Sequence, residues 1–263
     1  MKNFWKDINN IKKFISGKSL IVLFLDFDGT ISPIKSTPKK AKIAPKTQEL
    51  LKKLSVSPNI LTVIISGRSL KDLRQKIPPE IVNLAANHGL EWVIEGKYNH
   101  VPLKSKYLRS LRLAKLSIKN LAESFPNIII EDKKLGVAIH YRLLDNHQII
   151  IFKTRFKSII KKYTDANLLE VINGKKVFDI RPAVNWTKGN FAKSIVEKIV
   201  SQGRNPLVIC IGDDTTDEDM FNKFDSGITI KVGKNNVSKS KYYVQNVDEV
   251  AKFLQLLIES SVV

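Results

Sequence analysis

The chain has 263 residues and is 43% hydrophobic, which is enough for a sizeable core and excludes an intrinsically disordered protein. Its 44 lysine and arginine residues outnumber 25 aspartate and glutamate residues, giving a formal net charge of +19. The single cysteine, Cys210, excludes a disulfide scaffold and a zinc site made of cysteines, so we expect it to be an inert packing residue.

No apolar run approaches the roughly 18 residues that a membrane-spanning helix needs. The apolar stretch behind the basic N-terminus covers only residues 20–25 and stops at Asp26, which makes it too short for a signal-peptide core. We therefore expect a cytoplasmic protein that does not associate with membranes.

The positive charge raises the possibility of a nucleic-acid partner, because basic proteins attract phosphate backbones. Only eight of the 44 basic residues are arginines, the residue type that reads bases and phosphates with two parallel hydrogen bonds. The lysines are spread along the chain at polar positions of apolar patterns. A solvated lysine surface is therefore the favoured interpretation, and a basic nucleic-acid-binding protein on the same fold is the alternative.

Residues 20–103 alternate between short apolar runs and amphipathic segments, a pattern typical of strands and helices in turn. We predict strands over 20–25, 59–65 and 81–86, helices over 44–54 and 70–76, and a hairpin over 91–101. Residues 104–181 differ, because two helix patterns are each followed by two strand patterns. The helices are expected over 104–125 and 146–163, and the strands over 128–131, 135–142, 168–172 and 177–181.

After residue 181 the alternation of strands and helices resumes. Helices are expected over 188–200, 218–224 and 248–259, and strands over 206–211, 227–232 and 242–244. Alternation of this kind predicts an α/β core with a parallel, Rossmann-like sheet covered on both faces. The predicted domains are a core formed by 1–103 and 182–263 and an inserted α+β cap domain formed by 104–181.

Polar clusters follow four of the predicted core strands. They are Asp26 with Asp28, Ser66-Gly67-Arg68, Asn87-His88-Gly89, and Gly212-Asp213-Asp214 followed by Asp217. Ligands of open α/β sheets bind at the carboxyl ends of the strands, where we expect the first, second and fourth clusters to meet. Carboxylates gathered in one place need a cation, and Mg²⁺ is the usual choice when the substrate brings phosphate oxygens.

A phosphate cradle at this edge would need a lysine as well as a hydroxyl group. Lys188 opens a predicted helix directly after Trp186-Thr187, which makes it the candidate beside Ser66. Each cluster taken alone also fits a turn or a helix N-cap. Because all four follow apolar strands in this order, a shared functional site is the better interpretation.

Several segments resemble the trehalose-6-phosphate phosphatases, a family of the haloacid dehalogenase-like phosphatases. The matching segments are Leu-Asp-Phe-Asp-Gly-Thr-Ile-Ser-Pro-Ile (25–34), Ile-Ser-Gly-Arg (65–68), Asn-His-Gly (87–89), Val-Ala-Ile-His-Tyr-Arg (137–142), Asp-Ile-Arg-Pro with Trp-Thr-Lys-Gly (179–189), and Gly-Asp-Asp-Thr-Thr-Asp-Glu-Asp-Met-Phe (212–221). The last segment is the most specific, and the similarity extends over nearly the whole chain. The family's fold and cap agree with the core and insert predicted above.

The resemblance implies a Mg²⁺-dependent phosphatase that hydrolyses trehalose 6-phosphate through an aspartyl-phosphate. Asp26 would be the nucleophile, Asp28 the general acid and base, and Ser66 with Lys188 would hold the phosphoryl oxygens. The metal would lie between the Asp26 carboxylate, the Asp28 carbonyl and Asp213, with Asp214 and Asp217 in direct or indirect contact. Gly67 and Arg68 would bind substrate beside Ser66.

The sugar would be bound by residues of the insert, namely His140, Tyr141, Arg142, Asp179 and Arg181. A polar, solvent-exposed sheet face is the competing interpretation of these residues. Family members usually carry glutamate where Asp179 stands, and often an arginine shortly after the His-Gly at 88–89. These departures keep open a sucrose, glucosylglycerol or mannosylglycerate phosphate as substrate. His88 fits a packed strand-end histidine as well as a functional residue.

Further expectations concern partners and motion. The length leaves room for core and cap only, so a separate synthase enzyme is expected to supply the sugar phosphate to a monomeric phosphatase. The cap is expected to rock against the core through the crossings near 102–104 and 181–184, which would exclude water during the reaction. A catalytically inactive regulatory homologue is disfavoured because every acidic motif residue is present.

Overall fold

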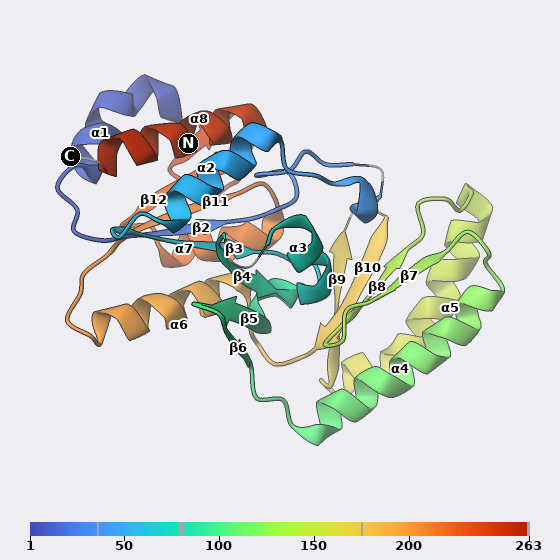
Figure 1. Ribbon diagram of the computed structural model, residues 1–263. Helices are drawn as coiled ribbons and strands as arrows, with labels where there is room; N and C mark the ends of the chain where they lie inside the picture. Colours follow the sequence, from blue (N-terminus) through green and yellow to red (C-terminus); the bar gives the residue numbers. More distant parts are fainter. Residues whose placement is uncertain (36, 79–80, 175, 262–263) are drawn as a thin grey trace. The chain divides into compact units, whose positions relative to one another are not determined.

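The computed structural model describes residues 1–35, 37–78, 81–174 and 176–261 (Figure 1). The chain divides into two compact units, Met1–His100 with Thr187–Val263, and Val101–Trp186. The second unit extends past the insert end expected at residue 181, because β10 (Val177–Pro182) includes Pro182 and the Ala183 amide donates to Leu168 O at 3.1 Å. The second core segment was predicted to run from 182 to 263, and its last two residues, 262–263, lie outside the described residues.

The first unit is built on a nine-stranded sheet of order β1-β13-β12-β11-β2-β3-β4-β5-β6. Its strands are β1 (Lys2–Asn3), β13 (Tyr242–Val244), β12 (Ile228–Val232), β11 (Leu207–Gly212), β2 (Ile21–Leu25), β3 (Ile60–Ile65), β4 (Asn83–Ala86), β5 (Glu91–Ile94) and β6 (Lys97–His100). All neighbouring strands from β1 to β4 are parallel, and only the pairings of β4 with β5 and β5 with β6 are antiparallel. The predicted α/β core with a mostly parallel sheet is confirmed.

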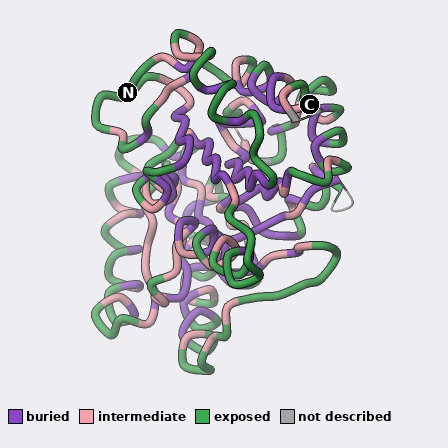
Figure 2. The backbone as a smooth tube through the Cα atoms, turned by 90° about the vertical axis from the view of Figure 1, so that its left-hand side faces the viewer, coloured by how far each residue is buried: buried purple, intermediate pink, exposed green. Residues whose placement is uncertain are grey.

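Helices cover both faces of this sheet. They are α1 (Ile8–Ile15), α2 (Pro45–Ser55), α3 (Leu70–Lys76), α6 (Lys188–Val200), α7 (Glu218–Lys223) and α8 (Val247–Ser261). The helices α1, α2, α3 and α8 share one hydrophobic cluster with one face of the strands, while α6 packs against α7 on the other face (Figure 1). Strands β2 and β11 are buried along their whole length, which explains their uninterrupted apolar runs. In Figure 2, buried segments run through the middle of the core while exposed segments lie mostly at its outside.

The N-terminal segment carries structure for which the sequence analysis made no prediction. After β1, a 3₁₀ helix (Phe4–Asp7) leads into α1, whose Ile11 and Ile15 are buried. Phe4 is fully buried and contacts the rings of Trp5, Tyr242 and Phe253 edge-on at centroid distances of 5.1–5.9 Å. These contacts join the N-terminus to β13 and α8, a long-range arrangement that no local pattern indicates.

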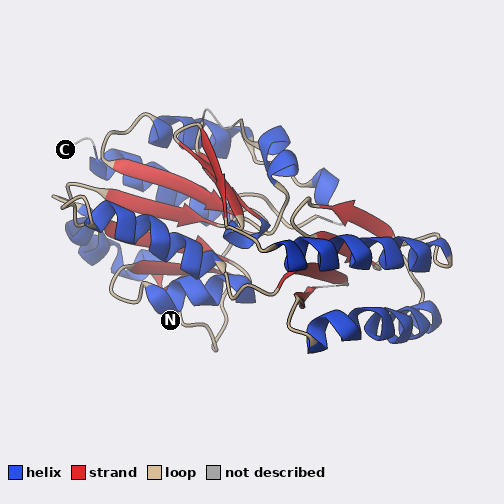
Figure 3. Ribbon diagram, turned by 90° about the horizontal axis from the view of Figure 1, so that it is seen from below, coloured by secondary structure: helices blue, strands red, loops and turns tan. Residues whose placement is uncertain are grey.

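The second unit is an antiparallel four-stranded sheet of order β7-β8-β10-β9 with two long helices (Figure 3). Its elements are α4 (Ser105–Glu123), β7 (Ile129–Asp132), β8 (Val137–His140), α5 (Asn146–Asp165), β9 (Leu169–Gly174) and β10. It has its own hydrophobic cluster, in which Phe156 stacks on Phe178 with ring centroids 4.3 Å apart. The helix–strand–strand order repeats twice, as the sequence predicts. Across both units, no helix in the described ranges is long and apolar enough to cross a membrane.

Candidate active site

The carboxyl ends of β2, β11 and β3 bring together residues that are far apart in the sequence. These strands are adjacent and parallel, so Asp26 directly follows β2, Ser66 directly follows β3, and Asp213 directly follows β11. The amide of Asp26 donates to the carbonyl of Ile211 at 2.9 Å, which extends the sheet pairing into the site. The predicted convergence at one edge of the sheet is therefore present.

A buried lysine links two of the aspartates. Lys188 is the first residue of α6, whose N-cap Thr187 accepts a hydrogen bond from the Asn190 amide at 3.1 Å. Its Nζ donates to Oδ1 of Asp26 at 2.6 Å and to Oδ1 of Asp217 at 2.8 Å. All three side chains are at least nine-tenths buried, so water contributes little to neutralising them.

The electrostatics of the cluster show an excess of negative charge. Burial raises the pKa of Asp26 well above its usual value; Asp217 and Asp213 raise it further, while Lys188 opposes them. Burial followed by repulsion from Asp217 raises the pKa of Asp213 to about 7. Burial alone would lower the pKa of Lys188, yet the carboxylates of Asp217 and Asp26 raise it, so this side chain is a fixed cation. One lysine does not balance three carboxylates.

The donor set fits a hard divalent cation. Carboxylate oxygens of Asp26, Asp213 and Asp217 lie within 4.8 Å of one another, and all are oxygen donors of the kind that Mg²⁺ prefers. Gly29 leaves room for this arrangement, because a Cβ at this position would lie 2.1 Å from Oδ2 of Asp213. Its φ of +82° is also favourable only for glycine. A bound cation would also remove the repulsion between carboxylates that helps to raise the pKa values of Asp26 and Asp213.

The five residues predicted to hold metal differ in what their carboxylates contact. Asp217 is already occupied, because Oδ2 accepts from the amides of Asp213 and Asp214 at 3.0 Å while Oδ1 accepts from Lys188. The Asp214 carboxylate caps a 3₁₀ helix (Thr215–Asp217) by accepting from Thr215. Burial acts to raise the pKa of Asp214, but the hydrogen bonds from Thr215 outweigh burial and lower it. Asp26 and Asp213 are therefore the carboxylates best disposed to bind a cation.

Arg68 lies on Asp28 in a bidentate ion pair. Its Nε and Nη2 donate to the two carboxylate oxygens of Asp28 at 2.7 and 2.6 Å, and its Nη1 contacts Asp72 at 2.5 Å. The guanidinium also lies over the ring of Phe27 at 4.9 Å, and Arg68 is only 6% exposed. Substrate binding by Arg68 remains a prediction, and the structure adds that its side chain orients Asp28.

The Asn87-His88-Gly89 segment lies against the Ser66 loop, a placement that the sequence analysis did not include. The amide of His88 donates to the carbonyl of Ser66 at 2.9 Å, and the amide of Asn87 donates to the carbonyl of Arg68 at 2.8 Å. A Cβ on Gly67 would lie 2.7 Å from the His88 ring, so glycine is required there. Asn87, His88 and Gly89 all have positive φ, and this strained turn packs against the loop that carries Ser66.

Lys231 is a buried cation of this edge that the sequence analysis missed. Its Nζ donates to the carbonyl of Asp214 at 3.0 Å and to Oε1 of Glu218 at 3.1 Å, and the residue is 3% exposed. It therefore holds the loop that carries Asp213 and Asp214. The sequence did contain a signal for Lys231, namely a lysine near the end of a mostly apolar strand.

The sugar-binding candidates of the second unit lie on its sheet, where acids and bases are paired. His140 contacts Glu131 at 3.3 Å, Asp179 accepts from Lys133 at 2.7 Å, and Arg181 donates through Nε to Glu170 at 2.7 Å. Among described residues, Nη1 of Arg181 is buried without a hydrogen-bond partner.

Two further candidates lie just beyond β8, which ends at His140 rather than at residue 142. Tyr141, one of the predicted sugar-binding residues, is 5% exposed and packs its ring against Phe178 and Phe152, which argues against the alternative of an exposed polar position. Arg142 is exposed in the following turn. Lys133 and Glu131 were not predicted, since nothing in their local sequence indicates their partners.

Comparisons with known proteins agree with this geometry. The family model described as trehalose-phosphatase matches residues 24–251. Trehalose-phosphate phosphatase B of Arabidopsis thaliana is 30% identical over 274 aligned positions, covering 98% of this chain and 70% of the relative. A crystal structure described as a trehalose-6-phosphate phosphatase related protein has a TM-score of 0.77 at 25% identity, covering 92% of this chain and 98% of its own.

A more distant likeness shows the fold alone. A haloacid dehalogenase-like hydrolase from B. subtilis has a TM-score of 0.58 at 15% identity, covering 90% of this chain and 99% of its own. Together with the matched family model, which spans most of the residues, these similarities settle the relationship. The chain belongs to the trehalose-phosphatase family, a family of phosphoric monoester hydrolases with a haloacid dehalogenase-like fold.

Proposed function

We propose that this protein hydrolyses trehalose 6-phosphate to trehalose and inorganic phosphate with Mg²⁺ as cofactor. Family membership supports the activity, and the name of the Arabidopsis relative supports the substrate. The observation that carries the proposal is the buried cluster in which Lys188 bridges Asp26 and Asp217 beside Asp213. Such a cluster provides a nucleophile, a fixed cation and a cation-binding site within a few ångströms.

In the first step, an Oδ of Asp26 attacks phosphorus and the bond from phosphorus to the sugar oxygen breaks. Asp28 gives a proton to that leaving oxygen, so trehalose departs neutral and Asp26 carries the phosphoryl group. Lys188 and the hydroxyl of Ser66 stabilise the phosphoryl oxygens while negative charge shifts among them. The ion pair with Lys188 also holds Asp26 in one orientation for the attack.

In the second step, Asp28 accepts a proton from a water molecule as the water oxygen attacks phosphorus. The bond from phosphorus to Asp26 breaks, inorganic phosphate leaves, and both aspartates return to their starting states. Arg68 contacts both carboxylate oxygens of Asp28 in this structure, which favours the ionised carboxylate, so this contact has to open when Asp28 takes up the proton that it gives in the first step. Gly67 is proposed to contact the substrate beside Ser66, and its lack of a side chain leaves room for the ring of His88.

Mg²⁺ would be held by the carboxylates of Asp26 and Asp213 and by the backbone carbonyl of Asp28. When bound, it supplies the positive charge that lets a carboxylate approach a phosphate dianion. Asp217 and Asp214 keep their supporting positions, the former on Lys188 and two amides, and the latter as a helix cap.

We further propose that the unit Val101–Trp186 acts as the cap that recognises the sugar and excludes water. His140, Arg142, Asp179 and Arg181 are the proposed sugar-binding residues, and the unpartnered Nη1 of Arg181 favours this role. A separate synthase as the source of substrate, a monomeric state and a cytoplasmic location complete the proposal.

The test is a phosphate-release assay on the purified protein. We expect release from trehalose 6-phosphate in the presence of Mg²⁺, loss of release with EDTA, and loss in the Asp26→Asn variant. Ranking by kcat/KM against the phosphates of sucrose, glucosylglycerol and mannosylglycerate checks the sugar. Release no faster than that of the Asp26→Asn control would overturn the activity, and a higher kcat/KM for another ester would overturn the substrate. A gel shift at low salt would support the nucleic-acid alternative.

A further inference from the structure

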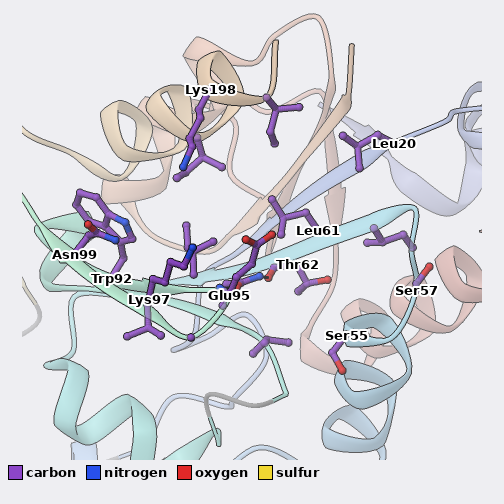
Figure 4. Close-up of a pocket in the computed structure, with 18 of the residues that line it drawn as sticks. Leu20, Ser55, Ser57, Leu61, Thr62, Trp92, Glu95, Lys97, Asn99 and Lys198 are labelled. Atoms are coloured by element: carbon purple, nitrogen blue, oxygen red, sulfur yellow. Dashed lines mark hydrogen bonds between the residues drawn. The ribbon is translucent and has the colours of Figure 1, made fainter. Parts of the chain in front are cut away.

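The core sheet has a second hollow at the opposite edge from the carboxylate cluster. A groove of about 950 Å³ is lined by the amino-terminal ends of β3 and β4, the β5–β6 hairpin and the C-terminal half of α6 (Figure 4). Ligand sites commonly have volumes of about 300–1,000 Å³. Thr62 is the lining residue of β3 nearest in sequence to Ser66, and a strand rises about 3.3 Å per residue, so the groove begins about 13 Å from Ser66 along the strand. It is therefore a different site from the catalytic one.

The groove is strongly basic. Arg74, Lys97, Lys198 and Arg204 line it, against a single acid, Glu95. In the described parts of the chain, none of these four cations forms an ion pair with a carboxylate. In Figure 4, Lys198 from α6 and Lys97 from the hairpin reach toward the same space. Uncompensated cations that meet in one hollow favour an anionic ligand.

The remaining lining groups indicate what the anion is attached to. Trp92 is half-buried in the wall and packs on Phe191 of α6, with ring centroids 5.3 Å apart, so its indole is held in place. Ser57, Asn99, Ser194 and Gln202 add hydroxyl and amide groups to the lining, and Asn99 lies near Trp92 in Figure 4. A fixed aromatic ring in a groove that also has polar lining groups suits a polyhydroxylated ring, whose C–H face packs on the indole while its hydroxyls form hydrogen bonds.

We propose that this groove binds a phosphorylated sugar as a ligand, separately from the catalytic site. The phosphate contacts Lys97 and Lys198, and the sugar packs on Trp92. This assignment gives part of the high positive charge of the chain a specific role. It also places the ligand on α6, the same helix that begins with Lys188.

The test uses glucose 6-phosphate as the probe, with glucose and inorganic phosphate as separate arms, in EDTA so that the carboxylate cluster is not loaded with metal. Binding is followed by tryptophan fluorescence and by isothermal titration on the full chain. We expect saturable binding of glucose 6-phosphate, at least tenfold weaker binding of inorganic phosphate, and no binding of glucose. The W92F variant should lose the fluorescence change.

Charge-reversal variants locate the site. K97E/K198E should weaken binding of glucose 6-phosphate at least tenfold while leaving the hydrolysis of p-nitrophenyl phosphate unchanged. K12E/K13E, on exposed positions of α1 in the same unit, makes the same charge change and should bind as the unmodified protein does. If charge reversal impairs folding, K97Q/K198Q takes its place. No saturable binding, equal weakening by K12E/K13E, or unchanged binding in K97E/K198E would overturn the proposal, and equal affinity for inorganic phosphate would overturn the sugar part.

Discussion

The two units of this protein arrange their buried charges in opposite ways. At the carboxyl edge of the core sheet, Lys188 pairs with Asp26 and Asp217 while Asp213 lies beside them, and burial with mutual repulsion raises the pKa of Asp26 and of Asp213. On the sheet of the second unit, each acid has a base beside it, as in Lys133 with Asp179 and Arg181 with Glu170. Of these two sets of charged residues, only the aspartate cluster of the core has an excess of negative charge.

This difference assigns different tasks to the two units. Buried charges that are left unbalanced are costly, and they persist where a cation or a reacting group completes them. Balanced pairs keep their geometry without an added ion and present fixed donors and acceptors, which suits the recognition of a neutral sugar. This contrast agrees with the proposal that the core carries out the reaction and the second unit positions the sugar.

The largest expected effect separates two buried lysines. Lys188→Met removes the lysine that pairs with Asp26, and we expect kcat to fall about 1,000-fold, or about 4 kcal/mol, for trehalose 6-phosphate and p-nitrophenyl phosphate alike. Lys133→Met, at a similarly buried pair in the second unit, should leave the hydrolysis of p-nitrophenyl phosphate within a few-fold. Steady-state kinetics of both variants decide the point, with circular dichroism as the folding control. Equal losses of p-nitrophenyl phosphate hydrolysis would remove the distinction between the units.

The next effect concerns the metal. Mg²⁺ at 100 times its dissociation constant should raise the free energy of unfolding by about 2.7 kcal/mol, because it binds the folded core only. Asp213→Asn should abolish this gain, since it removes a carboxylate of the cluster. Glu170→Gln, which changes an acid of the second unit, should keep it. Chemical unfolding with and without Mg²⁺ measures the three proteins, and a Mg²⁺ gain that survives in Asp213→Asn would contradict the proposed site.

A smaller effect is expected at the paired charges of the second unit. Asp179→Asn leaves Lys133 without its carboxylate and should raise KM for trehalose 6-phosphate about tenfold, or about 1.4 kcal/mol. Hydrolysis of p-nitrophenyl phosphate, which carries no sugar, should be unchanged. Asp165→Asn is the control, because it changes an exposed ion pair of the same unit. A loss of kcat for both substrates would indicate that Asp179 takes part in the reaction, which would contradict the proposed division of tasks between the two units.

The smallest effect is a pH dependence in the second unit. Although burial opposes it, hydrogen bonds from Lys115 and the Lys134 amide lower the pKa of Asp132. A carboxylate whose pKa is lowered by folding stabilises the folded state above its usual pKa and loses this contribution as pH falls through the lowered value. The side chain is mostly exposed, so Asp132→Asn should cost about 0.5 kcal/mol at pH 7. Urea unfolding at pH 7 and pH 3 should show the difference shrinking at pH 3, and a difference that grows in acid would refute it.

Residues 26, 66, 188 and 213 could be predicted from the sequence because each is tied to the end of an apolar strand or the start of a helix. The strand order then follows from parallel pairing, so their meeting at one edge needs no side-chain detail. The helix over 188–200 was predicted with its observed bounds, since Thr187 provides a recognisable N-cap.

What the sequence missed depends on contacts between distant residues. The contact of Arg68 with Asp28 was missed because the two residues lie 40 positions apart and only the fold brings them together. The burial of Tyr141 was also missed, because the strand ends at His140 and the next side chain packs against Phe178 and Phe152. Lys231 in β12 and the N-terminal β1 were missed for the same reason, since their partners lie elsewhere in the chain.

The central claim is that Asp26 carries the phosphoryl group during the reaction. Rapid mixing with trehalose 6-phosphate and Mg²⁺, followed by borohydride reduction and peptide mass spectrometry, tests it directly, because reduction converts an aspartyl-phosphate to homoserine. The account predicts homoserine at position 26 in the unmodified protein and none in Asp26→Asn or in EDTA. Phosphate release from the unmodified protein without homoserine at position 26 in the trapped samples, or with homoserine at another aspartate, would contradict it.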